Sequence, residues 1–326
     1  AYFRQRQEAG FPWGPPEGQV AAAVEAPPSV SAPPAKPAPF VLEIGTEELP
    51  AGDLDSALEQ LRSAVPAMLD DLRLGHGSVR VLGTPRRLAI LVDELAPRQQ
   101  EQAAVIKGPP ADRAFDAQGK PTAAAIGFAK GKGVPVEALQ AREMDGGRYV
   151  VAEVRQPGRP ANEVLREALP GLIASLRFEM SMRWNASGVV FSRPIRWLAA
   201  VHGDSVIPFA FAGLVAGNRT RLMRFAADET AEIHTAADYP AILAKTGIAL
   251  DPDARRQTIR DQIEKLAARV GGEVPEMEGL LAEVANLVEQ PTALLGDFDP
   301  GFLKLPREVL VAVMRKHQRY FPVEKG

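Results

Sequence analysis

Basic and aromatic residues alternate in three short stretches of the second half of the chain. These stretches are residues 177–197, 218–225 and 315–321. Arginine and lysine suit phosphate groups, and aromatic rings suit unstacked bases, so the combination favours an RNA-contacting surface. The candidate contacts are Arg183, Trp184, Arg193, Arg196, Arg219, Arg221, Lys316, Arg319 and Tyr320. The alternative is a solvated charged face with the aromatic rings in the core, and the spacing leaves both interpretations open.

Three carboxylates stand close together near the start of the globular part: Glu43, Glu47 and Glu48. Such a group could carry out acid–base chemistry or hold a divalent cation. Acidic residues just ahead of a helix more often complement its N-terminal dipole, which is the plainer interpretation here.

Other kinds of site have no support in the sequence. Cysteine is absent, and the four histidines are scattered without metal-ligand spacing. Neither a glycine-rich phosphate loop nor a GxSxG nucleophile motif occurs. The sequence therefore predicts no catalytic, cofactor or metal site in this segment. The net charge of −3 also argues against a uniformly basic nucleic-acid coat, although it permits local basic patches.

The elements that position these residues follow from hydrophobic periodicity. Helices are predicted over residues 51–74, 122–130, 162–178, 252–270 and 280–288, and from Pro306 onward with Val309, Leu310, Val313 and Met314 on the buried side. Pro66 should kink or split the first of these helices, and Pro170 could break the third. Strands are predicted over residues 40–45, 79–82, 88–92, 148–154, 189–191, 195–201, 206–211 and 292–295. The fold class is α+β, in a multi-domain chain with mixed sheets and helical insertions.

Five regions are expected along the chain. They are a terminal tail (1–13), a Pro/Ala-rich linker (14–39), an α+β domain (40–106), a small helical insertion (107–147) and a second α+β domain with C-terminal helices (148–326). The linker has too few large apolar residues to offset its ordering entropy, so we expect it to be extended or disordered. No run of apolar residues is long enough to span a membrane.

Several motifs, in order, resemble the beta subunit of bacterial-type glycyl-tRNA synthetase. They are FVLEIGTEELP (40–50), GTPRRLAILVDEL (83–95), KGPPADRAFDAQGKPTAAAIGFAKGKGV (107–134), MRWNASGVVFSRPIRWLAAVHGDSVIPF (182–209), LLAEVANLVEQP (280–291) and EVLVAVMRKHQRYFPV (308–323). Residues 1–13 resemble the C-terminal end of the alpha subunit. The chain therefore resembles part of a fused alpha–beta enzyme.

The resemblance implies ATP-dependent attachment of glycine to its tRNA. It places the ATP, Mg²⁺ and glycine site in the alpha region, and it leaves this segment to support tRNA binding and alpha–beta assembly, or to act purely as a scaffold. It implies a homodimer of fused chains in a chloroplast or mitochondrion, with a bacterial cytoplasm as the alternative. The region 148–326 resembles the B3/B4-type module of phenylalanyl-tRNA synthetase.

One departure from the family pattern concerns a possible functional histidine. Where relatives usually carry Arg-Gly-His-Arg-Phe, this chain has Arg221-Leu222-Met223-Arg224-Phe225. Any role of that histidine is lost here, and Arg221 and Arg224 remain as candidates.

Overall fold

The computed structural model describes residues 27–326 except for 117, 225, 227 and 326. The tail predicted over residues 1–13, most of the linker and Phe225 lie outside the described residues. From Pro27 to Pro37 the chain has no regular structure, yet it is held by side chains of the globular part. Ser205 Oγ donates to the carbonyl of Ala32 at 2.8 Å, and Asn162 Nδ2 donates to that of Ser31 at 3.2 Å.

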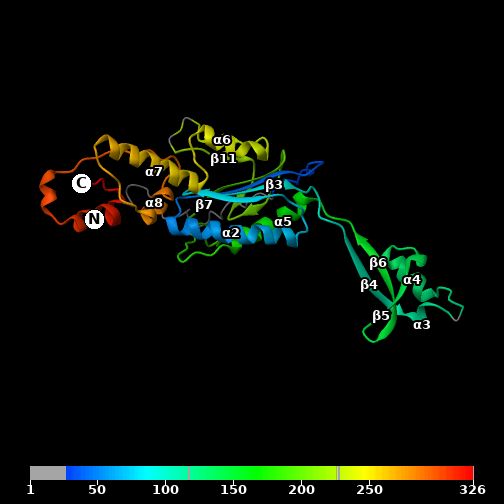
Figure 1. Cartoon of the computed structure of the whole chain (residues 1–326). Coiled ribbons are helices and arrows are strands. Elements are labelled where there is room, and N and C mark those ends of the chain that lie inside the picture. The colour runs from blue at the N-terminus through cyan, green and yellow to red at the C-terminus, as the bar shows by residue number, and fades with distance from the viewer. Residues whose placement is uncertain (1–26, 117, 225, 227, 326) are drawn as a thin grey trace, which may run out of the picture.

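The centre of the molecule is a five-stranded antiparallel sheet (Figure 1). Its strands lie in the order β2 (Val79–Thr84), β3 (Arg87–Leu95), β1 (Ala38–Thr46), β7 (Ile195–His202) and β8 (Ser205–Val206). The central strand is β1, in which Val41 lies opposite Leu91 of β3 and Val201 of β7. Segments predicted to lie in separate domains, 40–106 and 148–326, therefore share one sheet.

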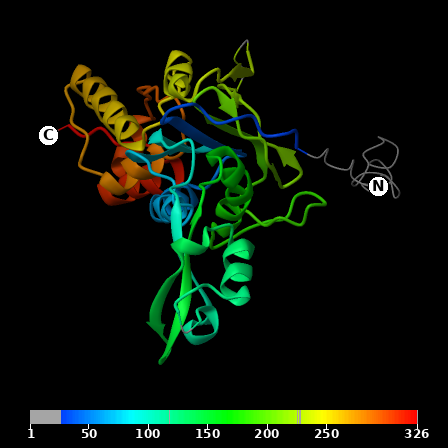
Figure 2. The same ribbon diagram turned by 90° about the vertical axis from the view of Figure 1, so that its right-hand side faces the viewer.

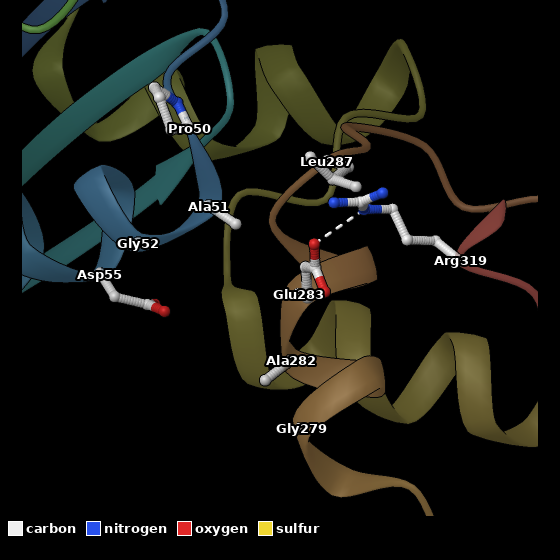
Figure 3. A pocket seen from close by; sticks show the side chains of 9 residues that line it. All are labelled: Pro50, Ala51, Gly52, Asp55, Gly279, Ala282, Glu283, Leu287 and Arg319. Atoms are coloured by element: carbon white, nitrogen blue, oxygen red, sulfur yellow. Dashed lines mark hydrogen bonds and ion pairs between the residues drawn. The ribbon is translucent and has the colours of Figure 1, made fainter. Parts of the chain in front are cut away.

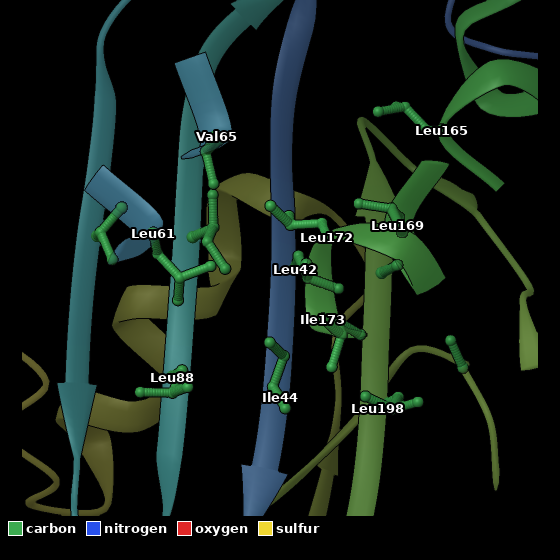
Figure 4. Packing of buried hydrophobic residues seen from close by; sticks show 14 of the residues in the cluster. Leu42, Ile44, Leu61, Val65, Leu88, Leu165, Leu169, Leu172, Ile173 and Leu198 are labelled. Atoms are coloured by element: carbon green, nitrogen blue, oxygen red, sulfur yellow. The ribbon is translucent and has the colours of Figure 1, made fainter. Parts of the chain in front are cut away.

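Two helices, α2 (Ala51–Asp71) and α5 (Ala161–Ser175), cover one face of this sheet. Leu61 and Val65 of α2 and Leu169 and Ile173 of α5 are buried against Leu42, Ile44, Leu88 and Leu198 of the strands, as Figure 4 shows. Pro66 and Pro170 lie inside these helices, which continue past them. The predicted break at Pro170 is wrong, because apolar packing before and after the proline holds the helix on the sheet.

The opposite face of the sheet carries a second, smaller core. Val41, Leu91 and Val201 point into it and pack with Tyr239 and Leu243 of α6 (Tyr239–Lys245). The chain reaches α6 through β9 (Ala210–Phe211), β10 (Leu214–Val215), β11 (Arg219–Arg221), β12 (Thr230–Glu232) and η2 (Ala236–Asp238). The α+β class predicted from the sequence is confirmed.

Residues 102–156 form a small domain that stands off one end of the sheet (Figures 1 and 2). It consists of a three-stranded antiparallel sheet with two α-helices and a short 3₁₀ turn. The elements are β4 (Gln102–Pro110), α3 (Ala111–Ala114), α4 (Ala123–Lys132), η1 (Val136–Ala138), β5 (Gln140–Met144) and β6 (Gly147–Gln156). The range predicted as a small helical insertion, residues 107–147, contains α3 and α4 together with β5 and the end of β4, and these two strands were not predicted. Both strands are largely exposed, and β4 ends in Gly-Pro-Pro, so they lack the usual apolar strand pattern.

The C-terminal part is helical. It contains α7 (Pro252–Arg269), α8 (Glu278–Ala285), η3 (Pro300–Lys304), α9 (Arg307–Val313) and a π-helical turn, η4 (Met314–Gln318). The predicted N-cap of α7 is confirmed, since Asp251 Oδ1 accepts a hydrogen bond from the amide of Asp253 at 2.9 Å. No helix among the described residues has an apolar stretch of the length that crosses a membrane.

Two predictions for the C-terminal part are wrong. Residues 292–295 form no strand, and Leu294 is 90% exposed. None of the described residues of α9 is buried, and Val309 and Val313, expected in the core, are about half exposed. Periodicity identified the helix correctly, but within the described residues nothing covers its apolar side. Residues 189–191 likewise form only an isolated bridge, between Phe191 and Met182.

Candidate nucleic-acid interface

The tight turn between β2 and β3 brings two adjacent arginines to one end of the sheet. Arg87 is completely buried there. Its guanidinium donates to Glu43 Oε1 of β1 at 2.9 Å and to Thr220 Oγ1 of β11 at 3.2 Å. It also donates to Glu289 Oε1 at 3.1 Å, in the loop after α8. One side chain thus ties together the central strand, a neighbouring hairpin and the C-terminal helical region.

The protonation states of Glu43 and Arg87 follow from their burial and from the charges around them. Burial raises the pKa of Glu43, while the charge of Arg87 and the hydrogen bond from Thr220 oppose the rise. Burial also acts to lower the pKa of Arg87, but the nearby Glu43, Tyr239 and Glu289 outweigh it and leave that pKa raised. Arg87 therefore remains a cation and is the charge that compensates the buried carboxylates.

A second buried arginine, Arg255 of α7, holds the backbone beside this group. Its guanidinium donates to the carbonyls of Gly83, Ala249, Leu250 and Ala285 at 2.6–3.1 Å. Burial lowers the pKa of Arg255 to about 10, so the side chain is still charged at neutral pH. Arg255 joins α7 and α8 to the end of β2.

Outside the buried group, Glu47 lies between two exposed arginines. Its Oε1 accepts from Arg196 Nε at 2.6 Å, and its Oε2 accepts from Arg224 Nη2 at 2.7 Å. Arg224 also pairs with Glu48 at 3.3 Å. The hydrogen bond from Arg196, together with the charges of Arg196, Arg224 and Arg86, holds the pKa of Glu47 below its usual value despite some burial.

Trp197 of β7 joins the buried and exposed parts of this cluster. The guanidinium carbons of Arg86, Arg87 and Arg221 lie 5.9, 5.6 and 5.3 Å from its ring centroid, within the range of cation–π attraction. The indole lies directly over Gly45 of β1, where an added Cβ would overlap the ring. Only glycine at position 45 leaves room for the Trp197 ring in this place, beside the three arginines.

A cavity of about 420 Å³ opens beside this cluster. It is lined by Glu47, Trp184, Asn185, Ile195, Arg196, Ala212, Gly213, Leu214 and Arg221. Three of the residues predicted from the sequence, Trp184, Arg196 and Arg221, therefore come together around one hollow. The lining of the cavity combines cationic groups with a half-buried indole and aliphatic side chains.

The other predicted residues of the first two clusters adjoin this cavity in the sequence but do not line it. Arg183 is exposed next to Trp184. Arg193 is half-buried and donates to the carbonyl of Ser192 at 2.9 Å. Arg219 is exposed on β11 and donates to Thr230 Oγ1 at 2.6 Å.

The third predicted cluster lies at a different cavity, of about 560 Å³, between the start of α2 and α8. Figure 3 shows Arg319 reaching toward Glu283, with which it pairs at 2.7 Å. Lys316 is exposed on η4, and Tyr320 is 62% exposed just after it. The two cavities share no lining residue among those described, so the structure does not unite the three clusters in one site.

The three carboxylates singled out from the sequence, Glu43, Glu47 and Glu48, all have arginine partners. Among the described residues, no group of three His, Asp or Glu side chains is arranged to hold a metal ion. Sequence reasoning did not place Arg86, Arg87, Asn185 or Glu289 at a site. The signal that could have found the first two is the pair of consecutive arginines in a tight turn between two apolar strands.

Comparison with known proteins places the chain in a family. Residues 40–326 match the family described as glycyl-tRNA synthetase beta subunit. The chain is 46% identical over 287 residues to glycine–tRNA ligase, chloroplastic/mitochondrial 2, of Arabidopsis thaliana, which covers 88% of this chain and 27% of that protein.

Bacterial proteins show a similar degree of identity to this chain. The glycine–tRNA ligase beta subunit of Moorella thermoacetica is 48% identical over 284 residues, which is 87% of this chain and 41% of the relative. That of Desulforudis audaxviator is 45% identical over 289 residues, 89% of this chain and 42% of the relative. The chain thus spans less than half the length of the relatives it matches. Because the match covers nearly all of the described residues, the chain belongs to the glycyl-tRNA synthetase beta subunit family.

Proposed function

We propose that this chain is part of a glycine–tRNA ligase in which it contributes to tRNA binding and to assembly of the alpha and beta regions. Its family membership supports the ligase assignment. The observation that carries the tRNA-binding role is the cavity whose lining includes Arg196, Arg221 and Trp184. Guanidinium groups beside a half-buried aromatic ring suit an RNA backbone with an unstacked base.

The remaining parts of the proposal concern the whole protein. ATP, Mg²⁺ and glycine would be used by the alpha region rather than by this segment. The alpha region of the same polypeptide is the proposed partner, in a homodimer of fused chains. The name of the Arabidopsis relative supports a chloroplast or mitochondrial location, and the bacterial relatives support a bacterial cytoplasm as the alternative.

Charge reversal tests the RNA-binding role. The triple variant Arg183→Glu, Arg193→Glu, Arg221→Glu removes three cations at or beside the cavity, none of which has a carboxylate partner among the described residues. We expect weaker binding of glycine tRNA. The slope of log affinity against log salt should fall by about 2 to 3, since each phosphate contact contributes roughly 0.7–0.9. The measurement is a filter-binding or fluorescence titration at several salt concentrations.

A matched triple variant provides the control. Arg62→Glu, Arg80→Glu and Arg260→Glu make the same change in charge on α2, β2 and α7, away from the cavity. Equal losses of affinity in the two triple variants would show that only overall charge matters. Unchanged binding by the cavity variant would contradict the proposed RNA surface.

A purely structural role is the second candidate, and one observation favours it. Arg196, Arg224 and Arg319 already bind carboxylates, as expected of arginines that join elements within the protein. Under this alternative, substituting them lowers the unfolding midpoint and leaves tRNA affinity unchanged. Urea unfolding measured beside tRNA binding on the same variants separates the two roles.

A further inference from the structure

The carboxylate of Glu47 occupies the position that an anionic ligand would take. Each of its oxygens accepts one arginine donor, Arg196 Nε at 2.6 Å and Arg224 Nη2 at 2.7 Å. A phosphate also presents pairs of anionic oxygens, and the arginine guanidinium can bind either group through paired N–H donors. The side chains of Arg196 and Arg224 are 50% and 47% exposed, so a ligand can reach them from solvent.

Arg221 supplies a cation that Glu47 does not occupy. It lines the same cavity, its guanidinium carbon lies 5.3 Å from the Trp197 ring centroid, and no carboxylate pairs with it among the described residues. The cation–π contact with Trp197 holds the guanidinium at the cavity while leaving its donors available. A first phosphate contact can therefore form at Arg221 before Glu47 moves.

The apolar residues of the cavity lining suit a base. Trp184 is half-buried and packs against the main core, which fixes the indole. Asn185 next to it is held by a hydrogen bond from its Nδ2 to the carbonyl of Ala212 at 2.8 Å. Ile195 and Leu214 complete an apolar lining. A volume of about 420 Å³ lies within the range of small-ligand pockets and holds one nucleotide rather than a duplex.

We propose that this cavity binds one unpaired nucleotide of an RNA, and that Glu47 fills the phosphate position in the free protein. The base lies against Trp184, and the phosphate takes the donors of Arg221 and of the arginines that Glu47 releases. This inference rests on the proposed RNA-binding function and specifies its ligand. Glu47 competes with the phosphate for the same arginine donors. An anion that binds these arginines only weakly therefore does not displace the Glu47 carboxylate.

The experiment uses the chain itself with four probes: a four-nucleotide adenosine RNA, adenosine 5′-monophosphate, adenosine and inorganic phosphate. Quenching of tryptophan fluorescence reports stacking, and the Trp184→Phe variant shows whether the signal comes from that ring. We expect the RNA and the monophosphate to bind, with adenosine and inorganic phosphate each at least about tenfold weaker, because each lacks one of the two contacts.

The decisive variant is Glu47→Gln, which removes the competing charge but keeps the shape of the side chain. We expect it to bind the RNA about tenfold more tightly than the unaltered chain, a gain of the size of one charge-assisted hydrogen bond. Glu59→Gln is the matched control, because it makes the same change at an exposed carboxylate of α2 that pairs with Arg62 and lies outside the cavity lining, and it should shift affinity less than twofold. Arg221→Gln should weaken binding about tenfold.

Three results would overturn the proposal. They are unchanged or weaker RNA binding by Glu47→Gln, adenosine binding as tightly as its monophosphate, and inorganic phosphate competing as well as the nucleotide. If Glu47→Gln unfolds, the indole NMR signal of Trp184 in the unaltered chain still tests the nucleotide pocket, since it must shift with the RNA and the monophosphate at concentrations at which adenosine and inorganic phosphate leave it unchanged. If none of the four probes binds but glycine tRNA still binds in a salt-dependent way, the nucleotide pocket is refuted and the proposed RNA surface is not. Loss of tRNA binding as well refutes both.

Discussion

Replacing Arg87 by methionine should be among the most destabilising changes in the chain. The substitution keeps the volume of the side chain but removes three hydrogen bonds, to Glu43, Thr220 and Glu289. It leaves the buried Glu43 without its cation, whereas Glu289 keeps Arg86 at 3.5 Å. Breaking a buried ion pair from one side costs about 3–5 kcal/mol, whereas the whole stability of a typical domain is about 5–15 kcal/mol.

The pH dependence of this loss separates charge from packing. Burial already raises the pKa of Glu43 above 4.5, and removing Arg87 raises it further. An acid whose pKa is higher in the folded state binds more protons there than in the unfolded state. The folded protein therefore loses stability as the pH rises from about 4.5 through the pKa of the acid in the folded state. The free energy lost in Arg87→Met should therefore be largest at pH 8 and should shrink as the pH approaches 5.

The assay is urea unfolding followed by tryptophan fluorescence at several pH values. Arg80→Met on the neighbouring strand is the control, because Arg80 is about half exposed and lies 3.9 Å from Asp93, so its loss should cost under about 0.5 kcal/mol. Adding Glu43→Gln to Arg87→Met should recover at least about 1 kcal/mol at pH 8, since one uncompensated charge disappears. A loss that is the same at every pH, or no recovery in the double variant, would refute the assignment of Arg87 as the compensating charge.

Three further predictions concern residues around the same sheet. Gly45→Ala should displace the indole of Trp197 and lower both the unfolding midpoint and the affinity for RNA. Gly52→Ala is the control: nothing lies within 4 Å of the added atom, so the unfolding free energy should change by less than about 1 kcal/mol. Burial lowers the pKa of His202 below 6.5, so the unfolded state binds the proton at a higher pH than the folded state does. The stability of the protein should therefore fall as the pH drops below about 6.5. Calorimetry should show a weaker dependence of stability on pH for His202→Gln. Arg255→Met should leave four backbone carbonyls without their donor and cost at least about 3 kcal/mol in urea unfolding, and a cost under 1 kcal/mol would contradict its role in joining α7 to β2.

Local patterns predicted much of the fold. Apolar periodicity found α2, α5 and the central strands, and Asp251-Pro252 marked the start of α7 within a residue. The same patterns failed where burial is slight. The strands β4 and β5 carry few buried side chains, and the apolar side of α9 is exposed, so periodicity alone could not place them relative to a core.

The candidate site could be predicted by residue type but not by geometry. Alternating arginine and aromatic residues identified Trp184, Arg196 and Arg221. Their arrangement depends on pairs far apart in sequence, such as Arg196 with Glu47 across 149 positions. Arg87 and Glu289, 202 positions apart, could not be matched from a single sequence either, because a buried ion pair leaves no local periodicity.

The position of β1 between β3 and β7 has a consequence for how the chain folds during synthesis. The strand β3 follows soon after β1, but the other edge of β1 stays open until β7 has been made, with the whole of the small domain in between. Contacts between such distant segments form slowly, and an open strand edge can pair with other chains. The small domain has its own core and can fold meanwhile. Aggregation therefore competes with folding mainly while ribosomes are between Leu95 and Ile195, and pausing there should lower the yield of folded protein.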